Sequence, residues 1–109
     1  MAQPVMQAKA KAAADEAKGA TGVGFDPSVI IGIVTTVLQL LAGCGKTPAQ
    51  AAAAMKKPNQ LQKLVFRAEC RRHTHNRDDA EVLYAACLDQ AASVTEEEAK
   101  AMYAEAGIK

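Results

Sequence analysis

One uncharged and strongly apolar run constrains the fold of this 109-residue chain more than any other feature. Asp26 followed by Pro27 is typical of a helix start, because Asp accepts a hydrogen bond from the first turn and Pro has no amide hydrogen to leave unpaired. The run covers residues 29–44 and ends among glycines, which suit a helix end. It is about 16 residues long, whereas a straight helix needs roughly 20 to cross a bilayer. We therefore expect a helix that is covered by protein.

Small and polar side chains recur along this run at steps of three and four residues, which places them on one side of a helix. A line of small residues lets a second helix approach closely. We interpret this line as the contact surface of an interaction helix and call it the interaction stripe: Ser28, Gly32, Thr36, Gln39 and Gly43. Membrane helices use the same spacing, so a small membrane-associated protein inserted through residues 29–44 is one alternative.

The rest of the chain favours further short helices. Four more helix starts are marked by capping residues, namely Thr47 (before Pro48), Asn59 (with Pro58 as the alternative start), Asn76 and Thr95 (with Glu98 three residues on). No segment shows the sustained alternation that is typical of a strand. Alanine supplies much of the apolar content, and it favours helix while burying little surface. The sequence therefore predicts an all-α fold, a small bundle of about five short helices.

Two of these predicted helices have distinct faces. In the helix over residues 60–73 the apolar face is formed by Leu61, Leu64, Val65 and Ala68. Another side of the same helix carries a basic stripe, which consists of Lys63, Arg67 and Arg71. In the helix over about 77–92 the predicted core face is formed by Ala80, Leu83, Tyr84, Cys87, Leu88 and Ala91.

Residues 1–25 differ from the rest of the chain. They are rich in Ala and Lys, have no broad apolar face, and end in a glycine-rich stretch. A short helix of this kind frays in water unless it packs against something. We therefore expect an N-terminal arm and linker over 1–25, flexible or docked on a partner, and a helical domain over 26–109.

Charge is divided along the second half of the chain, although the net charge is only +1. Residues 56–77 contain seven basic residues and one acidic residue, whereas residues 78–109 contain eight acidic and two basic residues. The balances are therefore +6 and −6. Such segments hold neighbouring helices together or form a bipolar surface for head-to-tail assembly. The small total charge argues against bulk attraction to nucleic acid.

Motifs that resemble chemical sites have simpler explanations. The Gly-Lys-Thr tripeptide lacks the earlier glycine of a phosphate-binding loop, since Leu40 stands at that position. Cys70 and His73 could share one metal-binding edge, and a site that adds His75 and one distant residue is geometrically possible, but zinc sites usually need a second close pair. Nucleophilic catalysis by Cys70 with His73 would lack an evident oxyanion hole. We predict no enzymatic activity, catalytic residue, cofactor or metal. A metal- or nucleic-acid-binding module around residues 63–77 is the second alternative.

The cysteine content bears on the compartment. Three widely spaced cysteines do not form a disulfide framework, and the N-terminus lacks the basic-then-apolar order of a secretory signal. We expect a reducing compartment or an assembled particle rather than a secreted setting. The function that uses most of these features is that of a structural or interaction protein, associating with itself or with a protein partner. A minor subunit of a large assembly such as a virion is the expected form.

Overall fold

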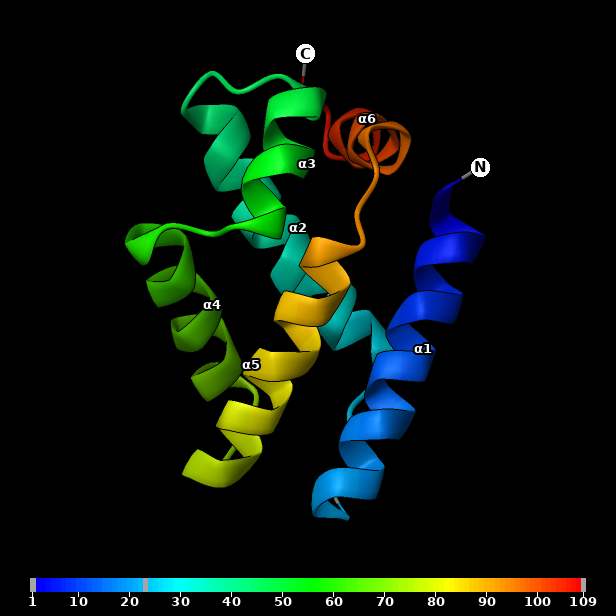
Figure 1. Ribbon diagram of the computed structural model, residues 1–109, viewed down its shortest axis with the longest axis vertical. Coiled ribbons are helices and arrows are strands. Elements are labelled where there is room, and N and C mark those ends of the chain that lie inside the picture. The colour runs from blue at the N-terminus through cyan, green and yellow to red at the C-terminus, as the bar shows by residue number, and fades with distance from the viewer. Residues whose placement is uncertain (1, 23, 109) are drawn as a thin grey trace.

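The computed structural model describes residues 2–22 and 24–108, and it is built of helices joined by short loops (Figure 1). The helices of this described part are α1 (Ala2–Thr21), α2 (Pro27–Gly43), α3 (Pro48–Lys56), α4 (Gln60–Arg72), α5 (Arg77–Ala92) and α6 (Glu96–Glu105). The all-α prediction is confirmed, with six helices in the described residues where about five were predicted. Met1 and Val23 of the predicted arm, and Lys109 of the predicted domain, lie outside the described residues.

The helices from α2 onward begin at the capping residues that the sequence marks. Each of these side chains accepts a hydrogen bond from a backbone N–H of the first turn; they are Asp26, Thr47, Asn59, Asn76 and Thr95. In α3, α4 and α6 the bond is reciprocal, because the third residue of the helix accepts a bond from the capping residue's own N–H. Just after α2, Gly45 has a φ of 83°, a left-handed conformation that favours glycine. Local capping chemistry therefore sets most of the helix boundaries.

α2 forms the centre of the core. It contacts each of the other five described helices and crosses behind α5 in the view of Figure 1. Its apolar side is almost completely removed from water; the buried residues are Ile30, Ile33, Val34, Val37, Leu38 and Leu41. The prediction that this run is covered by protein is confirmed for that side of the helix.

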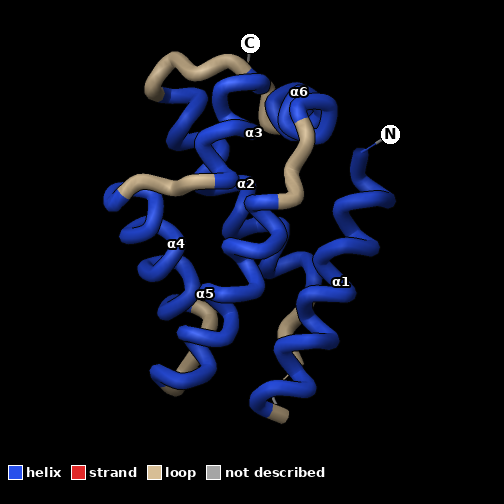
Figure 2. The backbone as a smooth tube through the Cα atoms, in the orientation of Figure 1, coloured by secondary structure: helices blue, strands red, loops and turns tan. Residues whose placement is uncertain are grey.

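α1 runs beside α5 and packs on it and on α2 (Figures 1 and 2). The buried face of α1 is narrow and, apart from Met6 near its start, is made of alanines, which let the backbones approach closely: Ala10, Ala13, Ala14 and Ala17. The ammonium group of Lys9 donates to the Ser93 carbonyl and to the Glu98 carboxylate, each at 3.0 Å. The predicted arm is thus helical over most of its length. Its docking on a partner, and the domain boundary at residue 25, stay predictions.

Glu98 joins two structural roles at the start of α6. Its Oε1 atom accepts hydrogen bonds from the Lys9 ammonium group of α1 and from the backbone N–H of Thr95, the capping residue of α6. Burial raises the pKa of this carboxyl, but the hydrogen bonds from Thr95 and the charge of Lys9 outweigh that effect and leave the pKa below its usual value. The ionised carboxylate therefore connects α1 to the turn between α5 and α6.

α4 turns a different side inward from the predicted apolar face. Its buried residues are Gln62, Phe66 and Cys70, and Val65 is half-buried. The prediction was wrong for three residues that point to solvent: Leu61, Leu64 and Ala68. The Phe66 ring packs edge-on against Tyr84 of α5, with ring centroids 6.5 Å apart, and a phenyl ring buries more apolar surface than a leucine. The aromatic contact with α5 therefore determines which side of α4 is covered.

The predicted core face of α5 is confirmed. Ala80, Leu83, Tyr84, Cys87 and Ala91 are buried, and Leu88 is half-buried. α5 contacts α1, α2, α3 and α4. α5 therefore lies between α4 and α1, which do not contact each other in the described structure.

Candidate interaction surfaces

The interaction stripe lies on the outward side of α2. Ser28, Gly32, Gln39 and Gly43 are exposed, and Thr36 is partly exposed. The Thr36 hydroxyl donates to the Gly32 carbonyl at 2.9 Å, and the Ser28 hydroxyl donates to the Asp26 carboxylate at 2.8 Å. These hydroxyls are therefore satisfied close by in the chain. The stripe is available at the surface, and its contact with a second helix stays a prediction.

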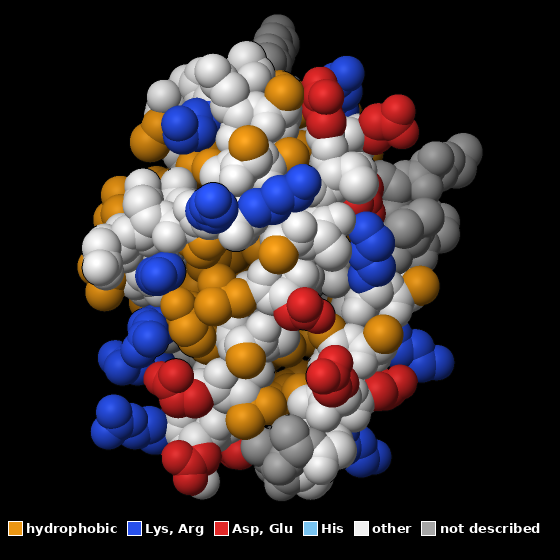
Figure 3. All heavy atoms as spheres, viewed as in Figure 1, with side chains coloured by type: hydrophobic (Ala, Val, Ile, Leu, Met, Phe, Trp, Pro, Cys, Tyr) orange, Lys and Arg blue, Asp and Glu red, His pale blue; other side chains and the backbone are white. Residues whose placement is uncertain are grey.

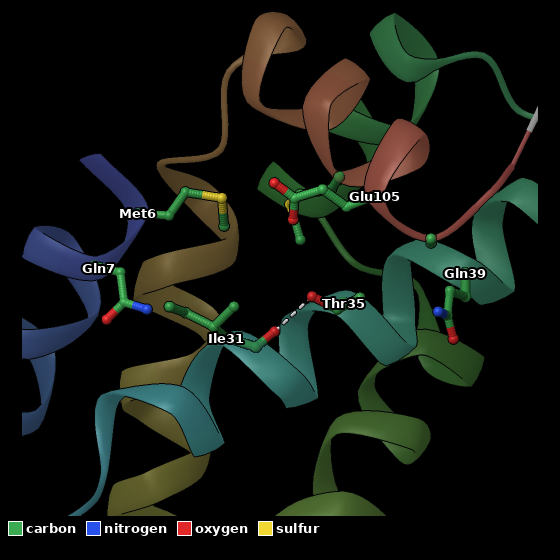
Figure 4. Close-up of a pocket in the computed structure, with 8 residues that line it drawn as sticks. Met6, Gln7, Ile31, Thr35, Gln39 and Glu105 are labelled. Carbon is green, nitrogen blue, oxygen red and sulfur yellow. Dashed lines mark hydrogen bonds between the residues drawn. The ribbon is translucent and has the colours of Figure 1, made fainter. Parts of the chain in front are cut away.

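A cavity of about 250 Å³ opens beside this stripe, between α1, α2 and α6 (Figure 4). Thr35 and Gln39 line it from α2, Met6 from α1, and Met102 and Glu105 from α6. The Thr35 hydroxyl donates to the Ile31 carbonyl of its own helix at 2.8 Å, the dashed line in Figure 4. Glu105 is the one ionisable side chain among the described lining residues, so the lining offers no acid–base pair.

The basic stripe is exposed along one side of α4. The Arg67 guanidinium lies over the Tyr84 ring, 4.6 Å from its centroid, and pairs with Glu81 at 3.7 Å. A hydrogen bond with Tyr84 and the charge of Glu81 raise the pKa of Arg67. At this point the basic and acidic segments meet across α4 and α5, while Lys63 and Arg71 are exposed.

The structure does not bring Cys70, His73 and His75 together. Cys70 is buried and faces Cys87 of α5, whereas the two histidines are exposed, His73 at the end of α4 and His75 in the following loop. The hydrogen bond with Cys70, together with burial, raises the pKa of the Cys87 thiol, which makes it a poor nucleophile. No group of three His, Cys, Asp or Glu side chains in the described residues could hold a metal ion.

The Gly-Lys-Thr tripeptide lies in the turn between α2 and α3. A helix precedes it, whereas a phosphate-binding loop follows a strand. Thr47 caps α3, and the Lys46 carbonyl accepts a hydrogen bond from the Tyr103 hydroxyl at 2.8 Å. The structure therefore assigns this motif to helix capping and to the attachment of α6.

A basic cleft of about 490 Å³ lies where α4 ends and α5 begins. Its lining includes Arg71, His75 and Arg77, all of them exposed. The first turn of α5 carries Asp78 and Asp79, whose charges already complement the helix dipole at this end. Neither carboxylate is among the described residues that line the cleft, but both lie at the same helix start and reduce its attraction for an anion.

Sequence reasoning missed a groove of about 430 Å³ between α1 and α5, here called the α1–α5 groove. Its apolar lining includes Ala13 of α1 with Val82, Ala85 and Ala86 of α5, and its carboxylates are Glu16, Glu81 and Asp89. Figure 3 shows acidic side chains around hydrophobic ones between these two helices. The described lining contains no Lys or Arg. The α5 side of the groove leaves a weak signal in the sequence. Val82 and Ala86 are apolar residues that lie off the predicted core face of the helix, together with Asp89.

The outward side of α4 carries three exposed apolar residues, Leu61, Leu64 and Ala68, which we call the leucine face. Leu61 is 55% exposed and Leu64 is 63% exposed, and they are the large hydrophobic residues that stand out in the described part of the chain. Single exposed leucines are ordinary, but these two lie one helical turn apart on one side. Figure 3 shows several basic side chains along the left edge of the molecule, where α4 lies. The leucine face is therefore a compact apolar patch with cationic neighbours.

The chain matches no protein-family model, no curated protein and no solved structure. None of the described helices combines the length and the apolar character needed to cross a membrane. The function of the candidate surfaces is therefore inferred from the chemistry of their own residues.

Proposed function

We propose that this chain is a non-enzymatic structural protein that acts by associating with protein, either other copies of itself or a different chain. The observation that carries the proposal is the leucine face of α4, which presents two leucines to water on a helix with a better-covered opposite side. Removal of apolar surface from water is the main driving force of protein association. The setting we propose is a large assembly such as a virion, with this chain as a minor subunit.

The interaction stripe of α2 supports the same proposal as a second surface. Apart from Gln39, its residues are small or carry hydroxyl groups that are already bonded nearby, so a partner helix could approach them without leaving those hydroxyls unpaired. The two surfaces lie on different helices, and a chain with two such surfaces can connect two neighbours.

The mass of the native particle tests the proposal. We expect the purified wild-type chain to have a mass above the 11.4 kDa of one chain, measured by light scattering over a concentration series. Leu64→Lys should lower that mass, because it places a hydrated charge in the patch. Ala53→Lys, at an exposed position of α3, adds the same charge elsewhere and should leave the mass unchanged. A chain of 11.4 kDa at every concentration, which also leaves its native source as a free monomer, would overturn the proposal.

A further inference from the structure

We propose that the leucine face of one copy docks into the α1–α5 groove of a second copy, so that the chain assembles head to tail. This inference rests on the proposed function and deepens it, since it names the partner and the surface that the leucine face contacts. It depends on the shape, polarity and charge of two surfaces that lie on one chain.

The groove defines what can fill it. Its floor is made of small apolar residues such as Ala13, Val82 and Ala86, and a helix that lies across such a floor needs protruding apolar side chains. Its carboxylates belong to Glu16, Glu81 and Asp89, all exposed. An occupant should therefore be an amphipathic helix with cations beside its apolar residues.

α4 has these properties. Leu61, Leu64 and Ala68 follow the i, i+3, i+7 spacing by which a helix anchors in an apolar groove. Lys63 and Arg71 lie beside them and are exposed. Arg67 already pairs with Glu81 of its own copy at 3.7 Å. Lys63 and Arg71 are therefore the cations that would meet Glu16 and Asp89 of the second copy.

One copy cannot fill its own groove with its own α4. Phe66 and Tyr84 form the contact between α4 and α5, and the leucine face lies on the opposite side of α4. The groove lies on the side of α5 that faces α1. α5 thus separates the two surfaces, and their contact must join two copies (Figures 1 and 2).

The charge of the whole chain permits this contact. A net charge of +1 produces little repulsion between copies, whereas the basic and acidic surfaces attract each other locally. Because the two surfaces differ, the contact is heterologous, and repetition of such a contact gives a ring or a filament. This is the geometry that a subunit of a larger assembly needs.

A mixing experiment with two variants tests the inference. The face variant carries Leu61→Ser with Leu64→Ser, which removes the anchors without adding charge. The groove variant carries Ala85→Arg, which fills the groove and repels the basic neighbours of α4. All three positions are exposed, so both variants should keep the wild-type circular dichroism spectrum and, at a concentration where every chain is monomeric, the wild-type melting temperature. Ala53→Arg on α3 is the matched control, since it makes the same change at an exposed position away from both surfaces.

We expect sedimentation velocity to show that each variant associates at least about tenfold more weakly than the wild type, the size of effect that loss of an interface anchor produces. The control should associate normally. An equal mixture of the two variants should recover a species of two chains, because the intact α4 of the groove variant can still dock into the intact groove of the face variant. Asp89→Lys is a second groove variant, and it should also weaken association.

Three results would overturn the inference. The first is a wild-type chain that stays monomeric on its own. The second is normal association of both groove variants while the face variant dissociates; the leucine face then binds something else, and the proposed function still stands. The third is a mixture that recovers no two-chain species, since a symmetric contact between like surfaces could not be restored by mixing.

Discussion

α2 and α4 make opposite use of their apolar residues. α2 buries its branched aliphatic side chains and exposes its small and polar ones, whereas α4 buries a phenyl ring, a thiol and an amide and exposes two leucines. The difference follows from position, because α2 contacts every other described helix and α4 contacts only α5 and α2. A helix at the edge of a bundle has neighbours that can bury only one narrow side of it. The neighbours, rather than the number of apolar residues on a face, then determine which side is buried.

The largest expected effect is on the covered side of α4. Phe66→Ala should reduce the free energy of unfolding by about 3–5 kcal/mol, because it leaves a cavity at a fully buried position against Tyr84. Leu64→Ala, on the exposed side of the same helix, should change it by less than about 0.5 kcal/mol. Urea denaturation of the two variants at low protein concentration measures both. Equal losses would show that α4 is rotated from the position described.

The same contrast should hold in α2 with a slightly smaller effect. Leu38→Ala should cost about 2–5 kcal/mol, since Leu38 is fully buried in the centre of the core. Its neighbour Gln39 belongs to the exposed interaction stripe, and Gln39→Ala should change stability by less than about 0.5 kcal/mol. Thermal unfolding of both variants gives the comparison. A large loss for Gln39→Ala would place the stripe inside the protein.

Much of the fold could be predicted from the sequence because its signals are local. Asp26, Thr47 and Asn59 each precede a helix, and the capping bonds that they make involve residues two or three positions away. The apolar residues of α5 follow one unbroken helical spacing, so only one side of that helix could enter the core. α4 was ambiguous, because Leu61 and Leu64 form one apolar arc and Phe66 lies on another. Tyr84 resolves that choice through a contact that helical spacing within α4 does not encode.

The candidate surfaces also differ in whether their signals in the sequence are local. The interaction stripe and the basic stripe each belong to one helix, and their exposure follows from its spacing. The α1–α5 groove joins residues as far apart as Ala13 and Asp89, and alanines give no periodic signal that would pair two helices. The opposite charge of the two segments was visible in the sequence, but only the packing shows that Arg67 meets Glu81.

Loss of the N-terminal cap of α4 should reduce the stability of the protein less than the core substitutions do. Asn59→Ala should cost about 1 kcal/mol, because it removes the side-chain oxygen that accepts a hydrogen bond from the Gln62 N–H at 2.9 Å, whereas the bond from the backbone N–H of residue 59 to the Gln62 side-chain oxygen is kept. Asn59→Asp keeps an acceptor at this position and serves as the control. Chemical denaturation of the two variants measures the cost. If Asn59→Ala were as stable as the wild type, the start of α4 would depend on packing alone.

The smallest expected effect is a difference between α2 and α4 in how the stability of each helix start depends on pH, because a carboxylate caps α2 and an amide caps α4. The Ser28 N–H and hydroxyl donate to Asp26 at 2.9 and 2.8 Å, and these bonds lower its pKa below the usual 3.8. Since the folded pKa is the lower one, the ionised cap stabilises the protein above the unfolded pKa, and this contribution is lost as the pH falls through the folded value. Asp26→Asn keeps a cap that does not titrate.

Its urea midpoint should therefore approach that of the wild type as the pH falls below about 4, the usual pKa of an aspartate, because the contribution of the ionised cap is lost from that pH down through the lower folded pKa. Asn59→Asp should introduce the same dependence into α4, where the wild-type cap has none. Parallel pH profiles for Asp26→Asn and the wild type would mean that the Asp26 carboxylate contributes nothing beyond what an amide supplies. In that case α2, like α4, would owe its start to the geometry of the capping bond and not to its charge.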